Sequence, residues 1–187
     1  MSEFGIDAAF RRFFDDHHTD LSRLAYLVTG DSQAADDLAA DAFVEVWRHW
    51  ERVQAADSPV AYARGIVTNL ARQWIKRRTR ERSGLLRLGL LRRDQGESDT
   101  PAVLDVRAAL QRLPPRRREC VVLRYAFDVP EREVALILGI SVGAVKSHTS
   151  RGAAQLNGIL KKGGSPSGEP PDVRTCDEPG TSRQLFR

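Results

Sequence analysis

A run of cationic and hydrogen-bonding side chains follows a glycine-marked turn in the stretch EREVALILGISVGAVKSHTSRGAAQL, residues 131–156. Lys146, Ser147 and Arg151 can donate hydrogen bonds to phosphate oxygens and to the edges of bases. Small residues come just before them, so a helix that carries them could approach a groove of duplex DNA closely. The chemistry that these residues offer is therefore noncovalent recognition of a nucleic acid.

Two helices are needed to position this run. Gly139 would end the first helix, and Ser141 is a good N-cap for the second. The apolar stripes of the two helices comprise Val134, Ile137 and Leu138, then Val142, Val145, Thr149, Leu156 and Leu160. The outward face of the second helix then comprises Gly143, Ala144, Lys146, Ser147, Ser150 and Arg151. From these residues alone, a DNA-binding helix-turn-helix and a helical hairpin with a polar outer face both fit.

Charge is distributed unevenly along the chain. The net charge of +4 combines −7 over residues 1–60, +6 over residues 61–100 and +6 over residues 101–162 with a nearly neutral tail. An acidic front and two basic blocks indicate two kinds of partner, a basic or polar one for the front and a polyanion for the blocks. Solvated helix faces would give the same pattern without any partner, and charge alone leaves this alternative open.

The periodicity predicts an all-α chain of two small helical domains. Segments rich in Ala, Leu, Arg and Glu dominate, and strand signals are nearly absent. Turn formers and prolines divide the chain into a first module over residues 4–80 and a second over residues 103–162. Residues 81–102 are predicted to be a flexible linker, and the Gly-, Pro- and Ser-rich residues 163–187 a disordered tail.

The sequence offers little for catalysis or metal binding. Cys120 and Cys176 lack the paired spacing of a zinc site, and the four histidines form no ligand motif. No apolar run is long enough to cross a membrane, and charges interrupt the N-terminus where a signal peptide would be apolar. We therefore expect a cytoplasmic protein without enzymatic activity, cofactor, metal site or membrane insertion.

Residues 104–156, from LDVRAALQRLPPRRREC to SRGAAQL, resemble the promoter-binding region 4 of bacterial sigma factors of the extracytoplasmic-function (ECF) type. Leu110, Leu113, Arg118 and the VVLRY run at 121–125 carry the resemblance together with the helix pair. In that family, region 4 reads the minus-35 element of the promoter. The resemblance implies minus-35 contacts from Ser141, Gly143, Ala144, Lys146, Ser147, Ser150 and Arg151.

Two residues depart from the family pattern in this second module. Pro130 stands where many relatives carry a Ser-like cap, and Gly152 stands where many carry Ala. Glycine lowers helix propensity by about 1 kcal/mol relative to alanine. We therefore expect the back half of the recognition helix to be less stable than usual.

The segment AADDLAADAFVEVWRHW, residues 34–50, resembles region 2.2 of the same family. Asp31 would cap a helix that buries a stripe from Leu38 to Trp50. In the family, the opposite face docks on the clamp coiled coil of the largest RNA polymerase subunit. The resemblance implies polymerase contacts from Asp36, Asp37, Asp41, Val44 and Arg48. Ala40 stands where the family commonly has Gln, which removes a polar contact, and Asp36 could instead serve only the helix dipole.

The segment SPVAYARGIVTNLARQWIKRRTR, residues 58–80, resembles regions 2.3 and 2.4, which read and open the minus-10 element. The resemblance implies minus-10 contacts from Arg64, Asn69, Arg72, Gln73, Lys76 and Arg77. The loop at 51–59 lies where the family holds a flipped base. Aromatic residues nearby could stack on unpaired bases, although aromatics at helical spacing are more often core; these are Trp47, Trp50, Tyr62 and Trp74.

The resemblance as a whole implies a sigma factor most similar to the actinobacterial SigE-like subfamily. Its implied partners are core RNA polymerase, through the clamp coiled coil and the flap, promoter DNA, and an anti-sigma factor. Rigidly packed modules could not read both promoter elements, so the linker must extend on the polymerase. A free-standing helix-turn-helix regulator would need only the second module, and an RNA-binding helical protein would use only the basic block at 72–93.

Overall fold

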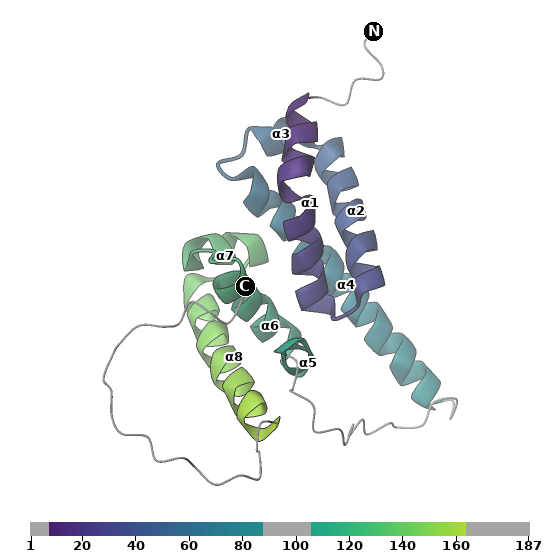
Figure 1. Ribbon diagram of the computed structural model, residues 1–187, viewed down its shortest axis with the longest axis vertical. Coiled ribbons are helices and arrows are strands. Elements are labelled where there is room, and N and C mark those ends of the chain that lie inside the picture. Colours follow the sequence, from purple (N-terminus) through teal and green to yellow (C-terminus); the bar gives the residue numbers. More distant parts are fainter. Residues whose placement is uncertain (1–7, 88–105, 164–187) are drawn as a thin grey trace, which may run out of the picture.

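The structure is a computed structural model that describes residues 8–87 and 106–163, and all its regular elements in these ranges are helical (Figure 1). In chain order the elements are α1 (Ala8–Thr29), α2 (Ser32–Arg48), α3 (Trp50–Gln54), α4 (Pro59–Arg87), α5 (Val106–Gln111), α6 (Pro115–Val121), the π-helix η1 (Val122–Ala126), α7 (Glu131–Leu138) and α8 (Val142–Gly163). The prediction of an all-α chain is confirmed for the described residues. No helix in these ranges is long and apolar enough to cross a membrane.

The first module is a bundle of α1, α2 and α4. Each of these helices contributes an apolar stripe that is almost fully buried: Leu21, Leu24 and Val28 from α1, Leu38, Ala42 and Val46 from α2, and Ala63, Val67 and Ala71 from α4. Gly30 separates α1 from α2 with a positive φ of 77°. Asp31 caps α2, because its side chain accepts a hydrogen bond of 3.0 Å from the Ala34 amide.

Two boundaries of the first module differ from the sequence prediction. The expected stripe of α2 included Trp50, but α2 ends at Arg48 and Trp50 begins the short helix α3. The stripe is therefore shorter by one turn. At the other end, α4 runs to Arg87 instead of stopping near residue 80, because Arg and Glu favour helix and no breaker follows directly. Residues 88–102 of the expected linker and 164–187 of the expected tail lie outside the described residues.

The second module packs α5, α6 and α7 against the long helix α8. Val134, Ile137 and Leu138 are buried as predicted, and Gly139 ends α7 in the left-handed conformation with φ 63°. Ser141 caps α8, since the Ala144 amide donates to its Oγ at 3.2 Å. Pro130 precedes α7 as its N-cap, where many relatives carry a Ser-like cap. The helix-turn-helix geometry is therefore present.

Gly152 lies at a close crossing of α8 and α6. A Cβ atom at this position would lie 2.6 Å from Cγ2 of Val121 and 3.3 Å from both Cβ and the backbone oxygen of Arg117. Such distances are shorter than ordinary van der Waals contact, so only glycine fits without a shift. From the sequence alone, this glycine only lowers the helix propensity of α8. The packing explains why a glycine is needed here: a larger residue would meet α6.

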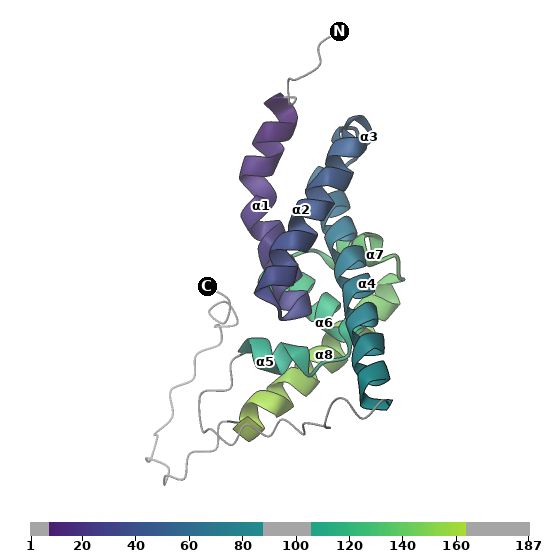
Figure 2. The ribbon, with the colours of Figure 1, turned by 90° about the vertical axis from the view of Figure 1, so that its right-hand side faces the viewer.

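The two modules pack directly against each other. Helix α7 lies beside the N-terminal half of α4, and α5 and α6 contact α1 (Figures 1 and 2). The buried residues of both modules form one continuous apolar cluster. In this state the chain is closed, whereas the resemblance implies an extended arrangement when two separated promoter elements are read.

Gly152→Ala tests the close crossing of α8 and α6. Overpacking costs about 1–3 kcal/mol and the gain in helix propensity is about 1 kcal/mol, so we expect a net loss of up to about 2 kcal/mol in the free energy of unfolding. Gly158 lies in the same helix, where an added Cβ atom would meet nothing within 4 Å, and Gly158→Ala is the matched control. Urea unfolding followed by circular dichroism measures both variants. Equal effects of the two substitutions would contradict the packing role of Gly152.

Candidate functional site

The outward face of α8 is accessible along its N-terminal half. Of the residues predicted to contact the minus-35 element, Ser141, Gly143, Lys146, Ser150 and Arg151 are exposed, and Ala144 and Ser147 are partly buried. The inward face is filled by the module itself, with Val145 fully buried and Thr149 and Leu156 nearly so. The arrangement presents small residues and donors on one side of a supported helix, which suits insertion into a major groove.

One of the cations on this face has a partner within its own module. The Lys146 ammonium lies 3.8 Å from Oε2 of Glu131, which is in the first turn of α7. Both side chains are well exposed, at 65% and 35%, so the pair is screened by water and easily exchanged for a phosphate. Ser141 has a structural role as the cap of α8 in addition to its predicted contact.

The exposed face of α2 carries the predicted polymerase-binding residues. Asp36, Asp37, Asp41, Val44 and Arg48 are all exposed, as the helical spacing indicated. Arg48 pairs with Glu45 on the same helix at 3.5 Å. The structure brings the three carboxylates onto one accessible surface whose negative charge would suit a basic partner.

An apolar groove of about 470 Å³ borders this acidic face, and it was not predicted from the sequence. Phe14 from α1 and Val44 and Trp47 from α2 are large apolar side chains that are 40–48% exposed. The groove is lined by Phe10, Arg11, Phe14, Ala40, Phe43, Val44 and Trp47. The FRRFF run at 10–14 was the available sign of this groove in the sequence. The groove forms only where α1 packs against α2, and the sequence did not predict that contact.

Helix α4 carries the six predicted minus-10 residues, and they divide into two groups. Asn69, Gln73, Lys76 and Arg77 are exposed or at the edge of the exposed surface. Arg64 and Arg72 are partly buried, because both point toward the second module. The predicted minus-10 surface of α4 is therefore only partly available in this structure.

The acidic partners of these arginines were not predicted from the sequence either. Glu119 of α6, whose side chain is 0% exposed, accepts from Arg72 at 3.2 Å and from Arg116 at 3.1 Å. Glu133 of α7 lies 3.9 Å from Arg64. The available signal was a glutamate directly before the apolar run CVVL, residues 120–123, since a carboxylate buried with that run requires cationic or hydrogen-bonding partners.

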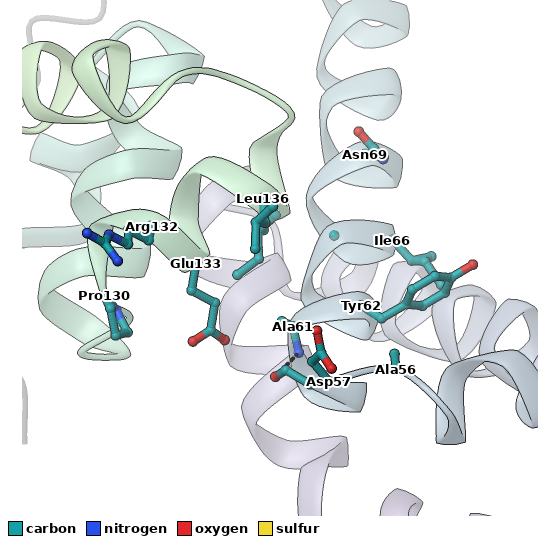
Figure 3. Close-up of a pocket in the computed structure, with 13 residues that line it drawn as sticks. Ala56, Asp57, Ala61, Tyr62, Ile66, Asn69, Pro130, Arg132, Glu133 and Leu136 are labelled. Carbon is teal, nitrogen blue, oxygen red and sulfur yellow. Dashed lines mark hydrogen bonds between the residues drawn. The ribbon is translucent and has the colours of Figure 1, made fainter.

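A groove of about 680 Å³ lies between α4 and α7, next to the loop that follows α3 (Figure 3). Tyr62, Ile66 and Asn69 line it from α4, and Ala56 and Asp57 from the loop. Across from them, Pro130, Arg132, Glu133, Leu136 and Ile137 form the wall contributed by the second module. The predicted base-holding loop at 51–59 is thus shorter than expected, because α3 occupies its first residues.

The four aromatic candidates have different environments. Trp50 packs on Phe10 and Phe13, with ring centroids 5.3 and 5.4 Å apart, and is part of the bundle. Trp74 is partly buried, and its ring centre lies 4.9 Å from the Arg78 guanidinium carbon. Trp47 is exposed in the apolar groove on α2, and Tyr62 lines the groove between the modules. Tyr62 is therefore the aromatic best placed to meet a nucleotide near the loop.

The described residues provide no group of three or more side chains that could hold a metal ion. Cys120 is fully buried, and burial together with the nearby Glu119 raises the pKa of its thiol to about 11. A thiol with this pKa stays protonated at neutral pH and is a poor nucleophile. Cys176 lies outside the described residues.

Family comparisons identify both modules. Residues 13–81 match the model of sigma-70 region 2, and residues 104–156 match the model of sigma-70 region 4. The chain belongs to the sigma-70 family of RNA polymerase sigma factors. The resemblance seen in the sequence is thereby confirmed for both modules, and its relatives include ECF sigma factors.

Relatives that carry the SigE name come from actinobacteria. The chain is 31% identical to ECF RNA polymerase sigma factor SigE of Mycolicibacterium smegmatis, over 78% of this chain and 59% of that protein. It is 30% identical to RNA polymerase sigma-E factor of Streptomyces coelicolor, over 73% of this chain and 77% of that protein. A probable sigma factor RfaY of Xanthomonas campestris is 30% identical, over 83% of this chain and 41% of that protein. The chain thus spans less than two thirds of the length of the SigE relative from Mycolicibacterium smegmatis and of RfaY.

Solved structures of sigma factors share the fold. The sigma factor RpoE of Bartonella quintana, in complex with the anti-sigma factor NepR, aligns with a TM-score of 0.66 and 22% identity, over 82% of this chain and 97% of that one. CnrH, in complex with the cytosolic domain of CnrY, aligns with a TM-score of 0.60 and 24% identity, over 84% of this chain and 91% of that one. These alignments support the two-module helical architecture.

Proposed function

We propose that this chain binds core RNA polymerase and directs it to promoters by recognising a minus-10 and a minus-35 element. The observation that carries the proposal is the coexistence, in family order, of an acidic exposed face on α2 and an exposed, capped recognition helix α8. The first would bind the clamp coiled coil of the largest polymerase subunit, and the second would enter the major groove at the minus-35 element. The flap of the polymerase is the proposed support for the second module.

Helix α4 is the proposed reader of the minus-10 element. Lys76 and Arg77 would follow phosphates, and Asn69 and Gln73 would hydrogen-bond exposed base edges. Tyr62 and the loop after α3 border a groove in which an unpaired base could be held. The first module, residues 4–80, would thus bind polymerase and melt DNA, and the second, residues 103–162, would read the upstream duplex, with 81–102 as linker and 163–187 as tail.

Regulation by an anti-sigma factor is the proposed control. The sigma factor RpoE that aligns with the chain was solved in complex with such a partner, NepR. We further propose a cytoplasmic protein that has no catalytic reaction of its own, because its chemistry consists of noncovalent contacts. A free-standing regulator or an RNA-binding protein would leave the acidic face and apolar groove of α2 without a use.

Run-off transcription tests the proposed function. Purified core RNA polymerase is assayed on a genomic fragment library with and without the chain. We expect new transcripts whose upstream sequences share two spaced motifs. No new transcripts, together with no binding of the chain to core polymerase, would contradict the proposal. The helix-turn-helix would then be part of an ordinary regulator.

Asp41→Arg tests the docking face on α2. Because Asp41 is exposed on the outer side of its helix, we expect an intact fold and a loss of roughly tenfold in affinity for core polymerase. Asp16→Arg makes the same charge change on the exposed surface of α1, away from the apolar groove, and serves as the control. Affinity is measured by pull-down with core polymerase. An unchanged affinity for Asp41→Arg would remove α2 from the docking surface.

Arg151→Ala and Lys146→Ala test the minus-35 face on α8. Removing a base contact costs about 1–3 kcal/mol of binding free energy at the cognate sequence, so we expect weaker binding to the upstream element and unchanged binding to core polymerase. Lys161→Ala, near the far end of α8, is the matched control. Electrophoretic mobility shifts on the selected and on a scrambled upstream element distinguish the roles. Equal losses on both DNAs would show that these residues hold only phosphate.

A further inference from the structure

Arg72, a predicted minus-10 residue, forms a two-pronged ion pair with the second module. Its Nε lies 3.2 Å from Oε1 of Glu119, and its Nη2 lies 3.4 Å from Oε2. The pair is well shielded, because the side chain of Arg72 is 19% exposed and that of Glu119 is 0% exposed. Nε and Nη2 of Arg72 are therefore not available to a phosphate while the pair is formed.

Arg64, a second predicted minus-10 residue, is covered by the same module. Its guanidinium carbon lies 5.5 Å from the centre of the Phe127 ring, and its Nη1 lies 3.9 Å from Oε1 of Glu133. The side chain is 14% exposed, and within residues 8–87 and 106–163 its buried Nε has no hydrogen-bond partner. Arg64 is thus buried without full satisfaction of its donors, which makes this part of the closed state costly.

The contact extends to the end of α1. Gln111 and Arg118 of the second module donate to the backbone oxygens of Leu27 and Val28, which are in the last turn of α1. Helix ends leave carbonyl oxygens without partners inside the helix, so these donors replace water. Arg118 also donates to the backbone oxygens of Gln111 and Leu113, and these bonds lie within its own module.

Closure leaves the other two functional faces accessible. The acidic residues of α2 are exposed, and so is most of the outward face of α8. Helix α4 is contacted by α7 (Figure 1). It is also contacted by Glu119 of α6. The second module therefore covers part of the α4 surface, at Arg64 and Arg72, and leaves the α2 and α8 faces open. The covered surface is the one that must meet DNA after strand separation.

We propose that the second module acts as a built-in cover for the minus-10 face of α4, held by contacts from Glu119, Phe127 and Glu133 to Arg72 and Arg64. In the closed chain, the α2 and α8 faces can meet their partners, but the donors of Arg64 and Arg72 that face the second module are not available to a DNA strand until the modules separate. This inference rests on the proposed function of α4. It assigns to two acidic residues of the second module the role of competing with DNA for the same arginines.

Opening has a low cost in unpaired charge. Glu119 keeps Arg116, at 3.1 Å in its own module, when Arg72 leaves. Arg64 and Arg72 gain water or phosphate, both of which can satisfy all their donors. A ligand that binds only the open state shifts the population toward it, and its apparent affinity is reduced by the fraction of chain that is closed. Weakening the cover should therefore raise the affinity of α4 for single-stranded DNA.

Glu133→Gln is the variant that tests the cover, because it removes the charge facing Arg64 without altering α4. Glu131→Gln is the matched control: it makes the same charge change two residues away on α7, but Glu131 faces Lys146 within the second module. Glu131→Gln frees Lys146, which can only raise the affinity for DNA. Any such gain would make the difference between the two variants smaller, so a higher affinity of Glu133→Gln cannot come from the choice of control. A random-sequence pool of single-stranded DNA is the probe. We expect Glu133→Gln to bind it about two- to fivefold more tightly than Glu131→Gln.

Energy transfer between dyes on the two modules reports closure directly. Dyes attached through Asp16→Cys on α1 and Asn157→Cys on α8, both exposed positions, are read in the full chain with Cys176→Ser. Cys120 is buried with its pKa raised to about 11, so it does not compete for the dye. We expect high transfer in the free chain, lower transfer in Glu133→Gln than in Glu131→Gln, and a fall in transfer as the DNA pool saturates the protein.

Three results would overturn the inference: equal DNA affinities of the two variants, low transfer in the free labelled chain that keeps Glu131 and Glu133, or high transfer retained at DNA saturation. Glu119→Gln is a second variant, which removes the charge that faces Arg72. Circular dichroism establishes whether this variant folds. If it does not fold, Glu133→Gln decides. A pull-down with core polymerase on the same variants reports the proposed function separately, because the inference can fail while binding to core persists.

Discussion

The buried carboxylate of Glu119 imposes the main constraint on the closed structure. A fully buried negative charge requires cationic donors close by, and here one donor comes from its own module and the other from α4. Arg72 must therefore turn away from solvent wherever the modules meet in this way. Because Arg72 lies on the helix predicted to follow the minus-10 strand, the same ion pair that joins the modules also removes a cation from that surface.

The junction between the modules differs in character from the core of the first module. Leu21, Leu24 and Val67 are fully buried in the bundle and would lose much apolar burial if it opened. The junction adds polar groups to its apolar contacts, including the pair of Arg107 with the Tyr26 hydroxyl at 2.6 Å and the pair of Gln111 with the Leu27 oxygen at 3.2 Å. Water can replace such contacts, so the modules can separate while each keeps its own core.

Local patterns predicted the helices and their faces because those features depend on neighbouring residues. Asp31 and Ser141 cap the helices they were expected to cap, and Gly139 ends α7. Contacts between distant residues were not predictable in this way. The reason for Gly152 lies in another helix, at Val121, and the partner of Arg72 lies in another module. The minus-10 residues were chosen by resemblance, and nothing in helical spacing indicated that Arg64 and Arg72 would face inward.

The contrast between α8 and α4 follows from how many surfaces each helix serves. The inward face of α8 is filled by its own module, and Lys146 on its outward face pairs with Glu131 of that same module, not with the first module. Helix α4 packs Ala63, Val67 and Ala71 into the bundle, so its remaining surface must serve both the second module and any bound strand. An α-helix has room for only one of these at a time along the arc from Arg64 to Arg72. Competition between closure and strand binding is therefore a consequence of the geometry of α4, independent of which promoter sequence is read.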